Sequence, residues 1–140
     1  MPRGLRRQRS SRRGTAVVEF AVVIPLFLLF IVGMIELGRA IMVQQLVTNA
    51  SREGGRIAGY DSTTQTSTIT SAVNAYLTNV NISGATTVVS PDPPSGAADG
   101  QQVSVTVSIP YANVSWVPSP FFLAGCTLQA TSVMRREPAP

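Results

Sequence analysis

The hydrophobic positions of this chain are concentrated in one uninterrupted run near its N-terminus. Residues 20–35 are sixteen uncharged and nearly all apolar residues, bracketed by Glu19 and Glu36. A helix of that length covers about 24 Å, a little less than a hydrocarbon core of ~30 Å. The neighbouring small and apolar residues extend the stretch to residues 16–38, which is enough to span a membrane. The pattern therefore predicts a transmembrane helix with Glu19 near one membrane face.

Two other kinds of segment share this pattern. A buried core helix is disfavoured because so small a chain has too little other material to cover a helix that is apolar all round. A removable signal peptide is disfavoured because the run exceeds the usual apolar length of roughly 7–15 residues. In addition, residues 36–39 (Glu-Leu-Gly-Arg) stand where a small-residue cleavage site would follow. Pro25 agrees with a membrane helix, which tolerates proline better than an exposed soluble helix does.

Beyond the apolar run, the pattern becomes that of an amphipathic helix. Apolar residues recur at helical spacing, and polar and charged residues fill the other faces. The apolar positions are Val43, Leu46, Val47, Ala50, Gly54 and Ile57. Glu36 and Arg39 are three residues apart and are expected to pair on the surface. The same spacing predicts a surface pair between Glu53 and Arg56. We expect one nearly continuous helix over residues 15–59, ended by the glycine at position 59.

The remaining residues, 60–140, favour a small α+β domain. A polar linker over residues 61–68 offers Ser and Thr side chains to cap a second helix, whose apolar positions run from Ile69 to Val80. Three later stretches favour β-strands. They are the β-branched residues 86–90, the strictly alternating residues 103–109, and residues 127–134. The expected fold is a long N-terminal helix, transmembrane in its first half, that carries a small antiparallel β-sheet domain with a second short helix.

The net charge of +4 belongs to the N-terminal tail. All eleven basic residues are arginines, and six of them lie in the first thirteen residues without an acidic neighbour. From Thr15 onward, five arginines face seven acidic residues. A basic tail can bind a phosphate backbone, but directly before a membrane span it is more typical of a topology signal, so we expect no nucleic-acid partner. Arg12 and Arg13 beside the span then place the N-terminus in the cytoplasm and residues 60–140 outside it.

The composition removes most routes to catalysis. The chain has no His, no Lys and one Cys. These absences exclude Ser–His and Cys–His pairs, Schiff-base lysines, and zinc sites built from His or several Cys. The acidic residues of the outer domain are scattered singly, which is too few in one place for a calcium site. We therefore expect no enzyme, no cofactor and no metal.

Two features of the outer domain leave alternatives open. Cys126 is expected to be a small core residue at the start of a strand, and an intermolecular disulfide is the alternative. The apolar, proline-broken residues 116–123 are expected to cover the core, and an exposed patch for a partner is the alternative.

The junction between tail and span, residues 12–20 (Arg-Arg-Gly-Thr-Ala-Val-Val-Glu-Phe), holds an informative combination. A glutamate at the edge of an apolar span is costly unless it meets a positive partner. A cut after Gly14 would create one, because the new α-amine of Thr15 in a neighbouring subunit could pair with Glu19. The alternative is that Glu19 lies in the headgroup region of an uncleaved anchor.

Three segments extend this junction into a longer pattern: residues 14–26 (GTAVVEFAVVIPL), 36–40 (ELGRA) and 47–58 (VTNASREGGRIA). They combine a glycine, Glu-Phe five and six residues after it, a proline within the span, and an Asn-Ala-x-Arg-Glu-Gly stretch. Each piece alone is weak, but the combination resembles the TadE-like pseudopilins of tight-adherence (Tad/Flp) type IV pilus systems. The resemblance covers about 45 residues, and the middle of the outer domain is not diagnostic.

The resemblance implies cleavage by a prepilin peptidase on the cytoplasmic side, after Gly14, with Thr15 as the mature N-terminus. It implies that Glu19 serves processing and subunit alignment and that Phe20 is the aromatic residue that follows it. It also implies a pilin-like fold in the bacterial cytoplasmic (inner) membrane, crossed once, with possible incorporation into a surface pilus. The implied partners are the membrane, the peptidase, other pilins and pseudopilins through helix packing, and the pilus assembly machinery.

The size of the chain sharpens the implied role. It is larger than the short major pilins of these systems, which favours a minor or priming pseudopilin acting in pilus assembly and surface adhesion. The alternative is an uncleaved, single-pass, membrane-anchored binding module outside the cytoplasm.

Overall fold

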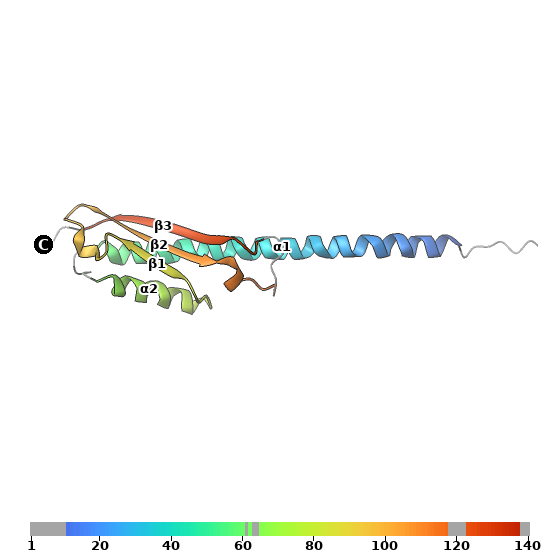
Figure 1. Ribbon diagram of the computed structural model, residues 1–140, viewed down its shortest axis with the longest axis horizontal. Helices are drawn as coiled ribbons and strands as arrows, with labels where there is room; N and C mark the ends of the chain where they lie inside the picture. Colours follow the sequence, from blue (N-terminus) through green and yellow to red (C-terminus); the bar gives the residue numbers. More distant parts are fainter. Residues whose placement is uncertain (1–10, 61, 63–64, 118–122, 138–140) are drawn as a thin grey trace, which may run out of the picture. The chain divides into compact units, whose positions relative to one another are not determined.

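The chain folds into two helices and a three-stranded sheet. The computed structural model describes residues 11–60, 62, 65–117 and 123–137. In chain order its elements are α1 Ser11–Ala58, α2 Thr66–Asn79, β1 Thr86–Ser90, the 3₁₀ turn η1 Pro94–Gly96, β2 Gln102–Pro110, the 3₁₀ turn η2 Tyr111–Asn113, and β3 Thr127–Arg135 (Figure 1). The predicted α+β class is confirmed. By its contacts the chain divides into two compact units, Met1–Ile35 and Glu36–Pro140.

Helix α1 contributes residues to both units. It begins at Ser11, ahead of the expected Thr15, and continues through Pro25. It ends at Ala58, next to the predicted terminator Gly59, whose N–H donates to the carbonyl oxygen of Gly55 at 3.0 Å. The chain then leaves the helical path, because the next N–H, that of Tyr60, donates to the carbonyl of Ile57 only three residues back.

The sheet is antiparallel and has the order β1-β2-β3. Its register places Val105 of β2 between Val89 of β1 and Ser132 of β3. The predicted alternation of buried and partly exposed residues along β2 is confirmed, since successive side chains of a strand point to opposite faces. Four apolar side chains of β2 are fully buried: Val103, Val105, Val107 and Ile109. The opposite face is polar, and on it the hydroxyls of Thr106 and Thr131 form a hydrogen bond of 2.8 Å.

The core of the globular unit Glu36–Pro140 lies between the sheet and both helices. From α1 it takes Val43, Val47 and Ala50, and from α2 it takes Ile69, Val73 and Leu77. Gly54 of α1 permits the close approach, because a Cβ there would lie 2.8 Å from Val73 Cγ2 and 3.0 Å from Val105 Cγ1. A glycine lowers the stability of an isolated helix. At position 54, however, it allows α1 to pack closely against α2 and β2.

Three local expectations are wrong. Glu36 does not pair on the surface, because its position on α1 faces the core and leaves it 1% exposed. Cys126 is exposed, and it lies just beyond the end of the β2–β3 pairing, where none of the described core residues covers it. Helix α2 has no side-chain cap: its N-cap residue is Gln65, and the hydroxyl of Thr66 instead bonds to the carboxylate of Asp92.

Candidate functional site

The predicted processing site lies in the first turns of α1. Gly14 is exposed, and a Cβ added to it would meet no atom within 4 Å. Among the residues that the structure describes, no packing therefore requires glycine at position 14. Gly38, farther along the same helix, has equally open surroundings. A requirement for glycine at position 14 would have to come from another molecule.

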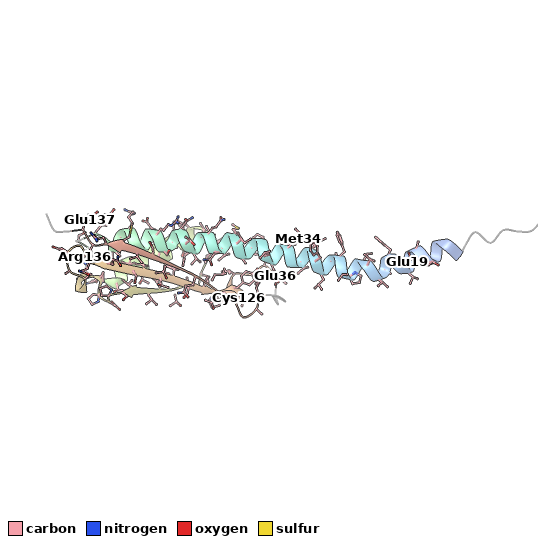
Figure 2. All side chains as sticks on the ribbon, turned by 90° about the horizontal axis from the view of Figure 1, so that it is seen from above. Glu19, Met34, Glu36, Cys126, Arg136 and Glu137 are labelled. Atoms are coloured by element: carbon pink, nitrogen blue, oxygen red, sulfur yellow. The ribbon has the colours of Figure 1, made fainter. Side chains whose placement is uncertain are left out.

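Glu19 and Phe20 are also displayed on the surface of α1, and Figure 2 shows Glu19 on the apolar part of the helix. Phe20 is 66% exposed. Among the side chains that the structure describes, none forms an ion pair with Glu19. Arg12 and Arg13 belong to the first turn of α1, but their side chains lie outside the described part. Within the described part of the chain no cation pairs with Glu19, which leaves this side chain available to a partner from lipid or another chain.

The apolar span is exposed along its length. The large apolar side chains exposed from Val17 to Leu37 have exposed fractions of 37–72%. Continuous apolar surface of this extent is unusual on a protein that faces water. At 1.5 Å per residue, residues 16–38 cover about 34 Å, more than a hydrocarbon core of ~30 Å. In the described part of the chain α1 is the one helix long and apolar enough to cross a membrane.

The globular unit begins with a buried hydrogen bond that sequence reasoning missed. The hydroxyl of Tyr111 donates to the backbone carbonyl oxygen of Glu36 at 2.8 Å. Both residues are at most 1% exposed. The bond attaches η2 to α1 where the uncharged run ends. The sequence indicates this bond only by the presence of a tyrosine directly after a strand.

Arg39 makes a second connection at the same end. Its Nε donates to the carbonyl oxygen of Val114 at 2.9 Å, and its guanidinium lies 4.7 Å from the centre of the Trp116 ring. Trp116 itself is 66% exposed. Trp116 therefore does not cover the core as expected for residues 116–123, whereas Leu123 packs against the core. Residues 118–122 lie outside the described part.

At the opposite end of the globular unit, hydrogen bonds from Arg136 and Glu137 connect the end of the chain after β3 to other elements. Figure 2 shows Glu36 and Cys126 at one end of the sheet, and Arg136 and Glu137 at the other. The buried Arg136 donates from Nη1 to the carbonyl of Pro94 at 2.8 Å, and the Glu137 N–H donates to the carbonyl of Gly59 at 2.8 Å. These bonds tie the chain after β3 to η1 and to the end of α1.

The predicted surface pair between Glu53 and Arg56 is confirmed. Their nearest charged atoms are 2.6 Å apart, and Arg56 also contacts the Tyr60 hydroxyl at 2.5 Å. The hydrogen bond from Arg56 lowers the pKa of the Glu53 carboxyl from its ordinary value of 4.5. The same bond raises the pKa of Arg56, so both side chains are charged near neutral pH. This pair is a local surface feature rather than a reactive centre.

Residues 14–56 match the family model described as TadE-like protein. The matched segment is 43 of the 140 residues, and it contains Gly14, Glu19 and Glu36. No curated protein and no solved structure matches the chain. The family match confirms the resemblance found in the sequence, and with the exposed apolar helix it supports a membrane protein associated with a Tad pilus.

Proposed function

We propose that this membrane protein, which is TadE-like over residues 14–56, is a minor pseudopilin of a Tad/Flp-type pilus. In this proposal it crosses the cytoplasmic membrane once, is cleaved after Gly14 by a prepilin peptidase, and acts in pilus assembly and surface adhesion. The observation that carries the proposal is the order of features along the chain: arginines before the matched segment, then Gly14, Glu19-Phe20 and an exposed apolar span. Its role is structural rather than catalytic.

The proposed orientation follows from the distribution of charge. Six arginines precede the span, while Arg39 is the first basic residue after it. Positively charged residues are retained on the cytoplasmic side of a membrane. The N-terminus is therefore assigned to the cytoplasm, and the unit Glu36–Pro140 to the outer side.

The structure around Gly14 is compatible with proteolysis. Because α1 begins at Ser11, the Gly14–Thr15 bond lies in its first turn. The first four N–H groups of a helix have no partner within it, and helix ends open at little cost. Glycine further lowers helix stability there. A peptidase would therefore need to unwind only the end of α1 to reach the bond.

Cleavage would also supply a partner for Glu19. A glutamate in an apolar span is stabilised by a nearby cation, and cleavage exposes a new α-amine on Thr15. In a packed array of such helices, the amine of one subunit could meet Glu19 of the next. This pairing would align the subunits.

Processing is tested by mass spectrometry of the protein isolated from cells with and without the peptidase. The proposal expects loss of residues 1–14 only where the peptidase is present. Gly14→Arg should leave the precursor at full length. Gly38→Ala is the matched control, since it changes an equally open glycine of the same helix and should leave cleavage unchanged.

An intact segment 1–14 in cells with active peptidase would overturn the processing step. That result would favour the second candidate, an uncleaved anchor carrying a binding module outside the cytoplasm. This candidate further expects the globular unit to bind a ligand or envelope component by itself.

A further inference from the structure

One end of the globular unit carries an uncharged stretch of the chain that includes an exposed tryptophan. Residues 110–126 contain no charged residue. The parts of this stretch that the structure describes include Trp116, which is 66% exposed, and Cys126, which is also exposed. The Tyr111 N–H donates to the Cys126 carbonyl at 2.8 Å, and the Tyr111 hydroxyl bonds to Glu36. These contacts place the stretch at the end where α1 enters the unit.

The exposed Trp116 ring is held in place. The guanidinium of Arg39 lies 4.7 Å from its centre, and Nε of Arg39 is fixed by the carbonyl of Val114 at 2.9 Å. An arginine stacked on an indole gains cation–π attraction, most strongly where water is scarce. The pair is therefore an ordered feature on the surface, with an apolar ring facing outward.

The position of Arg39 in the sequence gives the depth of the pair. If residues 16–38 cross the membrane, Arg39 lies at the outer boundary of the hydrocarbon layer. Trp116 is in contact with Arg39 and so lies near the same level. Neighbouring apolar side chains on α1 are exposed as well: Leu37 57%, Ile41 53% and Met42 48%.

We propose that Arg39 and Trp116 form an anchor that seats this end of the globular unit in the outer headgroup layer of the membrane. Tryptophan is enriched at membrane–water interfaces, where its ring is buried and its N–H stays hydrated. Arginine places its apolar stem in the same zone and its charge among lipid phosphates. Lipid is favoured over a protein partner because the anchor directly continues the membrane span. The proposal rests on the membrane insertion in the proposed function.

Such an anchor would fix how deeply each subunit sits before assembly. The buried Tyr111–Glu36 bond joins η2 to α1 at the same end. The membrane surface would then define the depth at which this end of the globular unit sits.

The test uses Trp116 as its own reporter, because it is the only tryptophan in the chain. The full-length protein is reconstituted in vesicles of phosphatidylethanolamine and phosphatidylglycerol, and tryptophan fluorescence is measured with aqueous iodide or with nitroxide-labelled lipids. The control carries Trp116→Phe with Val133→Trp, which moves the reporter to an exposed position on β3 near the Arg136 end.

The anchor predicts that Trp116 emits at shorter wavelength than the Val133→Trp reporter and loses most of its iodide quenching. Nitroxides at the headgroup should quench Trp116 more than nitroxides deep in the acyl chains. Arg39→Gln should shift the Trp116 emission to longer wavelength and increase its iodide quenching. Far-UV circular dichroism checks that this variant remains folded.

Equal iodide quenching of the two reporters, in protein that floats with the vesicles, would overturn the anchor and leave the proposed function standing. Shielding that appears only at high protein-to-lipid ratios would also overturn it, because a second copy would then cover the ring. Failure of the protein to float with the vesicles would overturn the membrane insertion itself.

Discussion

The Tyr111 hydroxyl donates a buried 2.8 Å hydrogen bond to the backbone carbonyl of Glu36, 75 residues earlier in the chain. Tyr111→Phe keeps the ring and removes this bond, so we expect a loss of about 1 kcal/mol in the free energy of unfolding. Tyr111→Ala also empties a fully buried site and should cost about 3–5 kcal/mol. Urea unfolding followed by circular dichroism measures both. A loss for Tyr111→Phe as large as that for Tyr111→Ala would contradict the role given to the ring.

The globular unit should fold only if it includes the second half of α1. Val43, Val47 and Ala50 of α1 are fully buried in the core, so a fragment of residues 60–140 would expose the surface they cover. We expect a fragment of residues 36–140 to give a cooperative thermal transition and dispersed NMR signals. The fragment 60–140 should give neither. A folded 60–140 fragment would show that α1 is dispensable for the core.

Gly54 and Gly38 should respond oppositely to a larger side chain. Gly54→Leu forces atoms into Val73 and Val105, where even a Cβ would lie within 3.0 Å of each. Overpacking of this kind costs about 1–3 kcal/mol. Gly38→Ala, with open space around it, should be neutral or gain up to about 1 kcal/mol from helix propensity. Thermal unfolding of both variants in detergent compares them.

The Glu53–Arg56 pair should give a small pH dependence of stability. The folded-state pKa of Glu53 is lowered by the hydrogen bond from Arg56. Its contribution is therefore present above the ordinary pKa of 4.5 and lost as the pH falls through the lower folded value. Glu53→Gln should destabilise slightly at neutral pH and not in acid. Because the pair is exposed, added salt should reduce the neutral-pH difference. A difference that persists in acid would assign the effect to packing.

Glu19 should matter more for assembly than for insertion. Glu19→Ala removes the proposed partner of the Thr15 amine, and it also removes a charge from the edge of the span, which favours insertion. We expect normal recovery of the variant in the membrane fraction and a strong loss of piliation by electron microscopy. Glu19→Asp should recover part of the piliation. Equal loss of insertion and piliation would refute the pairing.

The sequence predicts best those elements whose side chains alternate or recur with a fixed period. Strand β2 is an example, because each alternate residue from Val103 to Ile109 meets the same core. The exposed apolar half of α1 is another, since a helix apolar on every face has few environments available to it. These patterns are local, so neighbouring residues suffice to recognise them.

Contacts between distant residues could not be predicted in this way. Nothing near Arg39 in the sequence indicates that Trp116 stacks on it, and nothing near Glu36 indicates that its carbonyl accepts a bond from Tyr111. The prediction that Cys126 is a core residue was wrong for a related reason. The residue pattern of a strand does not indicate where the layer that covers the sheet ends. Gly14 and Glu19 were predicted as candidate site residues in a different way, from the order of residue types along one helix.

The continuity of α1 has a mechanical consequence. The same helix presents the apolar span and supplies the core residues Val43, Val47 and Ala50. A force applied along residues 36–58 of α1 would therefore act on the packed core as shear between this helix, α2 and the sheet. The resistance of the globular unit to such a force would be set by the packing of α1 against α2 and the sheet.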